Sequence, residues 1–209
     1  MRNTLLWAVL VLVGMAGFAL RPASAQTDVA FSLYGSFPEK TNGNGVVQSP
    51  AVGAGGLFQL RHISNPILGF EATYSFNRAN QRYTSDVAVT CPIPPAPCPA
   101  LSTSVASNAH EITIDWVPSL KIANLRPFGL LGVGVLLDVP SGGHDGTETD
   151  TNPVYLYGAG LDIALVPHIG LRLQYRGNLN EAPDVSLLFT SSKAFMHTAQ
   201  PMAGVYIRF

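Results

Sequence analysis

The sequence predicts an all-β fold, namely an eight-stranded antiparallel up-and-down transmembrane β-barrel. Three observations support this prediction. From residue 26 onward the chain falls into eight runs of alternating apolar and polar residues, and the connections between them are alternately short and long. Only 12% of the residues are charged and 47% are hydrophobic, whereas soluble domains carry about 25% charged residues. A closed barrel of amphipathic strands satisfies its backbone groups in lipid without a long apolar helix.

The first 25 residues predict a signal peptide that is cleaved on export. Arg2 supplies a positive start, an apolar stretch covers residues 5–20, and small residues at 23–25 allow cleavage before Gln26. An anchoring helix is the alternative, but ~16 apolar residues are few for a bilayer, which takes about 20. We therefore expect one barrel domain over residues 26–209. Its formal charge is −3, because the signal peptide removes two arginines from a chain of charge −1.

Turn signals separate the eight predicted strands. The strands cover residues 28–37, 52–62, 67–76, 110–120, 128–139, 154–165, 169–179 and 198–209. Three short connections lie at 64–66, 123–126 and 166–168, and four long polar ones at 38–49, 77–109, 140–153 and 180–197. In outer-membrane barrels the short turns face the periplasm and the long loops face outward. We therefore expect four extracellular loops.

Alternation divides each strand into two faces. In the strand at 67–76, the apolar face comprises Leu68, Phe70, Ala72, Tyr74 and Phe76, and the other comprises Gly69, Glu71, Thr73 and Ser75. In the strand at 110–120, Ile112, Ile114 and Trp116 oppose Glu111, Thr113 and Asp115. The strand at 128–139 is apolar on both faces, so its register stays open.

The last three strands continue the pattern. At 154–165 the apolar face comprises Tyr155, Tyr157, Ala159, Leu161 and Ile163, opposite Gly158, Gly160 and Asp162. At 169–179 it comprises Ile169, Leu171, Leu173 and Tyr175, opposite Gly170, Arg172, Gln174 and Arg176. At the C-terminal end it comprises Ala203, Val205, Ile207 and Phe209, opposite Met202, Gly204, Tyr206 and Arg208. We expect the apolar faces to contact lipid.

The polar faces carry balanced charge. Four basic and four acidic residues form the predicted lumen charge network: Arg61, Glu71, Glu111, Asp115, Asp162, Arg172, Arg176 and Arg208. The interior of an eight-stranded barrel is just wide enough for side chains to fill it. Because isolated charges there would be costly, we expect paired charges and hydrogen bonds that leave no wide pore.

Aromatic residues mark two levels of the predicted barrel. Those toward the loop end are Tyr74, Phe76, Tyr155, Tyr157 and Tyr175, and those toward the turn end are Trp116, Phe128 and Phe209. We expect them to form two interfacial girdles. The alternative is a soluble lipocalin-like carrier, in which the apolar faces would point inward around a ligand.

Two of the long loops contain residues that could be chemically active. Cys91 and Cys98 bracket a proline-rich stretch, and in an exported protein they predict a disulfide. A metal site is the alternative, but it needs more ligands than two thiols. The third long loop contains the polar group His144, Asp145, Glu148 and Asp150. Its spacing matches no calcium loop, so we expect a solvated loop, no metal and no cofactor.

Five segments of the sequence share a pattern with a known family: VGAGGLFQLRH at 52–62, GFEATYSF at 69–76, PFGLLGVGV at 127–135, YGAGLDIALVPHIGLRLQYR at 157–176 and VYIRF at 205–209. Together they resemble the small outer-membrane β-barrel proteins, the family that includes the transmembrane domain of outer membrane protein A and the opacity proteins. The resemblance implies a location in the cell outer membrane. It also implies contact with outer-membrane lipid and recognition of Phe209 by the barrel-assembly machinery.

These observations predict an integral outer-membrane protein with a structural or surface-interaction role and a possible extracellular partner bound through its loops. No basic run points to nucleic acid. The enzymatic alternative is a lipid A-modifying hydrolase, because His62, Ser64 and Glu71 are similar to the His-x-Ser pair and acid of outer-membrane lipid A deacylases. Ser64 is predicted to lie in a periplasmic turn, however, and Glu71 to face away from His62. We therefore expect no enzymatic activity.

Overall fold

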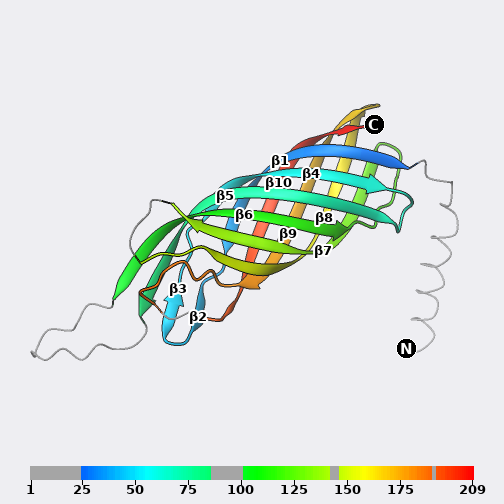
Figure 1. Ribbon diagram of the computed structural model, residues 1–209. Helices are drawn as coiled ribbons and strands as arrows, with labels where there is room; N and C mark the ends of the chain where they lie inside the picture. The colour runs from blue at the N-terminus through cyan, green and yellow to red at the C-terminus, as the bar shows by residue number, and fades with distance from the viewer. Residues whose placement is uncertain (1–24, 86–100, 142–145, 190–191) are drawn as a thin grey trace, which may run out of the picture.

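The computed structural model describes residues 25–85, 101–141, 146–189 and 192–209, and within them ten strands form one antiparallel sheet. Eight long strands close into a barrel (Figure 1): β1 (Gln26–Pro38), β4 (Gly53–Ile63), β5 (Gly69–Ser85), β6 (Ser102–Trp116), β7 (Leu125–Pro140), β8 (Asp150–Val166), β9 (Ile169–Glu181) and β10 (Phe195–Arg208). Each pairs with the next in this series, and β10 pairs with β1. The predicted eight-stranded up-and-down barrel is confirmed. The described residues contain no helix that is long and apolar enough to cross a membrane.

Strand pairing fixes the tilt of the barrel. The stagger is found by starting at Phe31 on β1 and stepping from each residue to its partner on the next strand until β7 is reached. In one direction, through β10, β9 and β8, this path ends at Leu125. In the other direction, through β4, β5 and β6, it ends at Val135. These end points lie ten residues apart on β7. With a strand spacing of ~4.8 Å and a rise of ~3.3 Å per residue, this stagger gives a tilt of about 40°. Ten residues of such a strand span about 25 Å along the barrel axis, the height of an outer-membrane apolar band.

The barrel is apolar outside and charged inside. On the outer surface Phe70 and Ile114 are 52% and 66% exposed, whereas Arg61 and Arg172 on the inner surface are fully buried. Side chains of neighbouring residues point to opposite sides of the sheet, so the sequence alternation places charge in the lumen. This arrangement is the reverse of a lipocalin-like carrier, whose apolar faces would point inward.

The register of β7, which the sequence left open, places its two central glycines inward. Leu131, Val133 and Val135 face outward, while Gly132 and Gly134 lie against β6. The prediction that Phe128 belongs to an aromatic girdle was wrong, because it shares the inward face and is 5% exposed. A girdle position needs outward parity, and Phe128 has the parity of the central glycines.

Two predicted boundaries differ at the loop end. The described part of the long connection predicted at 77–109 is almost entirely strand, because β5 and β6 continue as a paired ribbon from Asn77↔Ala109 to Thr84↔Ser102. The connection predicted at 38–49 contains a hairpin, β2 (Thr41–Gly43) and β3 (Val46–Gln48), which joins the edge of β5 (Figure 1). These segments have no apolar alternation, and backbone hydrogen bonds to distant residues hold them.

The hairpin and the turns use local backbone preferences. Asn44 and Gly45, both at positive φ, connect β2 to β3, as the two-residue turn of a twisted hairpin requires. In the turn between β4 and β5, Asn65 Oδ1 accepts hydrogen bonds from the backbone of Ile67 and Leu68.

The strand predicted over residues 110–120 ends at Trp116 instead of residue 120.

Candidate functional site in the lumen and at the loop end

The central lumen holds a closed network of two arginines and three acids. Arg61 Nε donates to Glu71 Oε2 at 2.7 Å, and its Nη1 lies 3.4 Å from Asp162 Oδ2. Arg172 bridges all three acids, with distances of 2.7 Å to Asp162 Oδ1, 2.8 Å to Asp28 Oδ1 and 3.4 Å to Glu71 Oε2. All five side chains are fully buried. Each charge therefore has a partner inside the barrel.

Strand register builds this network. Arg61 lies directly opposite Glu71 in the β4–β5 pair, and Asp162 lies opposite Arg172 in the β8–β9 pair. Directly opposed residues have their Cβ atoms about 5 Å apart, so opposite charges meet without strain. Asp28, opposite Arg61 in the β1–β4 pair, was missing from the predicted network. Its place on the polar face of the first strand was the signal available for finding it.

A second pair lies nearer the loop end. Arg176 Nη2 donates to Glu111 Oε1 at 3.1 Å, and Asn178 donates from Nδ2 to the other oxygen of that carboxylate. The remaining two predicted residues lie apart from these pairs. Asp115 is fully buried but takes part in none of the ion pairs seen among the described residues, and Arg208 donates to the Tyr206 hydroxyl at 3.2 Å.

Polar and aromatic side chains fill the space between the charges. Gln59 Nε2 donates to Glu71 Oε1 at 3.0 Å and to Gln174 Oε1 at 3.1 Å, which links β4, β5 and β9 across the lumen. The guanidinium carbon of Arg61 lies 4.0 Å from the centre of the Phe128 ring, a cation–π arrangement. The middle of the barrel is therefore a packed plug.

At the loop end the connection between β9 and β10 folds over the mouth of the barrel. Tyr83 donates its hydroxyl to the Pro183 carbonyl at 2.6 Å, and Gln48 Nε2 donates to the same carbonyl at 2.8 Å. Val185, fully buried, packs in a cluster with Val46, Tyr83 and Val105. The segment that carries Pro183 and Val185 thus forms a cap over the lumen.

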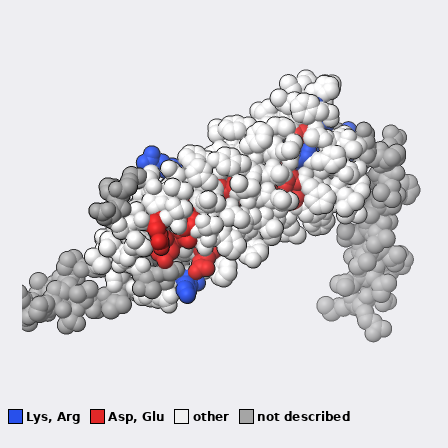
Figure 2. Space-filling model, in the orientation of Figure 1, with Lys and Arg blue, Asp and Glu red and all other residues white. Residues whose placement is uncertain are grey.

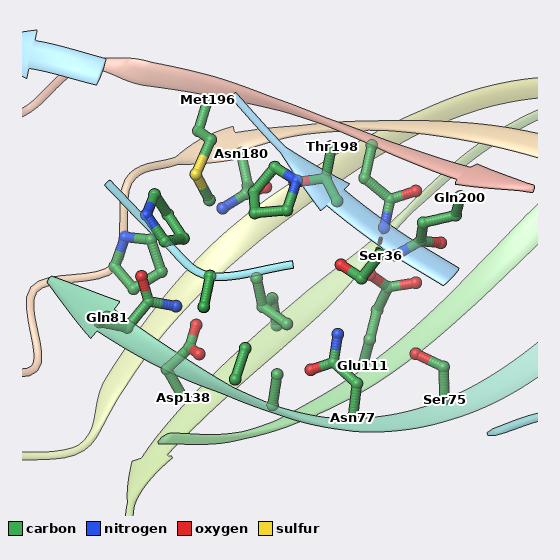
Figure 3. Close-up of a pocket in the computed structure, with 18 of the residues that line it drawn as sticks. Ser36, Ser75, Asn77, Gln81, Glu111, Asp138, Asn180, Met196, Thr198 and Gln200 are labelled. Atoms are coloured by element: carbon green, nitrogen blue, oxygen red, sulfur yellow. Dashed lines mark hydrogen bonds between the residues drawn. The ribbon is translucent and has the colours of Figure 1, made fainter. Parts of the chain in front are cut away.

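Beneath the cap lies a small cavity, which offers about 50 Å³ to water-sized molecules (Figure 3). Its lining includes the polar residues Ser36, Ser75, Asn77, Gln81, Glu111, Asp138, Asn178, Asn180, Thr198 and Gln200. Two of these are acidic and none is basic, so the cavity is electronegative.

Asp138 is one of these two acids. Val133 on β7 pairs with Tyr155, an outward-facing residue of the loop-end aromatic girdle, which marks the edge of the apolar band. Asp138 lies five residues further along β7 toward the loops, and therefore above the apolar band. It is 2% exposed, and Ser107 Oγ donates to its Oδ1 at 3.2 Å. Burial raises the pKa of Asp138 to about 7, and nearby Asp150 and Glu111 act in the same direction.

This geometry can be compared with known proteins. No protein-family model and no curated sequence matches the chain. Among solved structures, the chain is similar to OprG from Pseudomonas aeruginosa, with a TM-score of 0.55 at 9% identity over 89% of this chain and 96% of that one. It is also similar to the attachment invasion locus protein Ail of Yersinia pestis in complex with the heparin analogue sucrose octasulfate, with a TM-score of 0.51 at 15% identity. The Neisserial surface protein NspA has a TM-score of 0.50 at 15% identity. Both comparisons cover 89% of this chain and 99% of the other.

The chain has the fold of the small outer-membrane β-barrels. This shared fold and the apolar outer surface agree with the outer-membrane location predicted from the sequence.

As expected for an outer-membrane barrel, aromatic side chains cover both ends of its outer surface. Toward the loops, the Tyr74 hydroxyl is hydrogen-bonded to His110 Nδ1 at 2.9 Å, and the Tyr157 hydroxyl to His197 Nε2 at 3.0 Å. At the turn end Trp116 Nε1 donates to the Ile67 carbonyl at 2.7 Å. Such pairs keep the polar tips of the rings satisfied at a lipid–water boundary.

The residues of the hydrolase alternative are not assembled in this outer-membrane barrel. His62 lies on the outer surface with Nδ1 2.9 Å from Thr27 Oγ1, while Glu71 lies inside, paired with Arg61. Ser64 is exposed in the turn after β4. Since the acid and the imidazole are on opposite sides of the barrel wall, no relay connects them.

Several predictions fall outside the part of the chain that the structure describes. These concern the signal peptide predicted over residues 1–25, of which 1–24 are not described, the disulfide between Cys91 and Cys98, and His144 and Asp145 of the third loop. Among the described residues no group of three or more His, Cys, Asp or Glu side chains is arranged to hold a metal ion.

Proposed function

We propose that this protein is an integral outer-membrane protein whose barrel serves as a rigid anchor and whose loop end contacts an extracellular partner. The observation that carries the proposal is the plugged lumen. The five fully buried charges of the central network, with the glutamines and Phe128, occupy the space through which a solute would have to pass. A barrel without a passage is best suited to holding its loops in place.

The order of the loop end supports this role. The β5–β6 ribbon, the β2–β3 hairpin and the cap are joined by strand pairing and by the hydrogen bonds of Tyr83. Binding loops are usually presented by rigid scaffolds, because a pre-ordered surface loses less entropy on binding.

Charge favours a cationic partner over a polyanion. The described acidic residues of this end that are not buried are Glu39, Glu148, Asp150, Glu181 and Asp184, and the basic ones are Lys40, Arg78, Arg82 and Lys193. Acidic atoms also gather over the loop end in Figure 2. Ail was solved with a heparin analogue, which is strongly anionic. The acidic surplus here argues for a partner of opposite charge.

The barrel-assembly machinery and outer-membrane lipid complete the proposed set of partners. Phe209 is 75% exposed at the turn end, where its backbone N–H donates to the Thr27 carbonyl at 2.9 Å. An exposed aromatic ring at the end of a strand is available to a recognition factor and then to the membrane interface.

Protease shaving of intact cells tests the anchor role. We expect cleavage after residues of the loop end, such as Lys40, Arg82 or Lys193, and none at Arg126 or Lys121 of the turn end. A companion measurement is the permeability of liposomes that contain the purified barrel to small sugars, which should equal that of empty liposomes. Cleavage at the turn end from outside, or rapid sugar leakage, would overturn the proposal.

A further inference from the structure

The cavity beneath the cap contains two buried oxygens that lack a protein partner. Asp138 Oδ2 and Asn178 Oδ1 belong to side chains that are 2% and 3% exposed, and neither atom has a hydrogen-bond partner among the described residues. Both side chains line the cavity, into which Asp138 points in Figure 3. The Asn178 oxygen is fixed in orientation, because its Nδ2 donates to Glu111. Buried acceptors of this kind normally find a donor or a cation.

Like charges face each other at this place. Asp138 lies directly opposite Asp150 in the β7–β8 pair, an arrangement that is unfavourable unless something neutralises it. Asp150 uses its carboxylate to accept hydrogen bonds from Asn152 Nδ2 and from the backbone N–H of Asp184 in the cap, both at 2.7 Å. One carboxylate therefore points into the cavity while its neighbour holds the cap above it.

No counter-charge is supplied by the cavity wall. Glu111 is already paired with Arg176, which is not part of the lining. The groups that act on Asp138 are the Ser107 hydroxyl and Glu111 on β6 and Asp150 on β8, and the Tyr83 phenol on β5 lies nearby. None of these is basic, so the negative charge that Asp138 carries when it is deprotonated lacks compensation from the lining.

We propose that the capped cavity binds a hydrated divalent cation, with Asp138 and the Asn178 amide oxygen as its principal protein contacts. Hard cations of this class take oxygen ligands, and Mg²⁺ keeps several of its waters while using only one or two carboxylates. Such binding fits a small polar cavity whose described neighbourhood offers no group of three ligating His, Cys, Asp or Glu side chains. Asp150 adds charge from the next strand and links the site to the cap. The inference extends the proposed function and requires only the folded barrel.

Isothermal titration of the refolded barrel in detergent, freed of metal and held at pH 8, tests this site. Mg²⁺ and Ca²⁺ are titrated separately into the wild-type protein, Asp138→Asn and Glu148→Gln. Glu148→Gln is the matched control, because it removes the same charge from an exposed loop position. We expect saturable binding of at least one ion by the wild type, weakened about 10- to 100-fold in Asp138→Asn and changed less than about twofold in Glu148→Gln.

Absence of saturable binding of both ions by the wild type, or equal affinity of wild type and Asp138→Asn, would overturn the inference. If Asp138→Asn does not fold, Mn²⁺ added to the wild type provides a second test, because it broadens the nuclear magnetic resonance signals of residues near it. Broadening at Asp138 and Asn178 supports the site, and broadening confined to other residues refutes it. Heat-modifiable migration on a gel reports insertion independently, so failure of the cation site would leave the outer-membrane assignment standing.

Discussion

Replacement of Glu71 by Gln should destabilise the barrel strongly, because it removes a charge that two buried arginines share. Glu71 Oε2 lies 2.7 Å from Arg61 Nε and 3.4 Å from Arg172 Nη1, with every side chain fully buried. Breaking a buried pair while leaving its partner charged costs about 3–5 kcal/mol. The neutral amide keeps the volume and can still accept from Gln59, so most of this cost reflects lost charge rather than a cavity.

The size of the effect follows from what remains. Arg172 keeps Asp162 and Asp28, whereas Arg61 keeps only the longer 3.4 Å contact with Asp162. The network would then contain two positive and two negative charges, so the loss should lie near the lower end, about 3 kcal/mol. This corresponds to a change of roughly 100-fold in the unfolding equilibrium, since each 1.4 kcal/mol or so is a factor of ten.

Urea unfolding of the barrel in lipid vesicles, followed by the fluorescence of Trp116, measures this loss. Trp116 is the only tryptophan beyond the predicted signal peptide, and it lies at the turn end of the outer surface. Glu148→Gln is the control and should change the free energy by less than about 0.5 kcal/mol. A second variant, Arg61→Met combined with Glu71→Gln, should lose less than the sum of the single changes. A loss below about 1 kcal/mol for Glu71→Gln would refute the reasoning.

Three further predictions concern the loop end and the last strand. In the folded barrel the pKa of Asp138 is about 7, above its ordinary value of 3.8. Protonated Asp138 therefore contributes stability that is fully present below about pH 4 and is lost as the pH rises through 7. In metal-free buffer the free energy of unfolding of Asp138→Asn should accordingly rise relative to that of the wild type over this range, and a pH-independent difference would contradict the prediction. Tyr83→Phe removes a buried donor and should cost about 1 kcal/mol, with faster proteolysis of the 182–189 segment as the readout and unchanged proteolysis as the contrary result. Deletion of Phe209 should reduce the heat-modifiable fraction recovered from outer membranes, and normal recovery would count against recognition of that residue.

The alternation of the sequence determined the barrel and its two faces. Side chains alternate with a period of two that depends on the backbone alone, so Glu71, Arg172 and Ile207 could be assigned to a side without knowledge of their neighbours. Opposite charges on inward faces were likewise visible in the sequence. Their actual partners were not, because pairing depends on register between strands.

Tertiary structure decided the features that join residues distant in the chain. The inward position of Phe128 and the inclusion of Asp28 follow from the register of β7 with β8 and of β1 with β4. The β5–β6 ribbon lacks apolar alternation and is held by ladder hydrogen bonds. The cap depends on contacts such as Tyr83 to Pro183, separated by 100 residues. Local sequence carries no signal for such contacts, since their free energy arises only when the closed barrel brings both ends together.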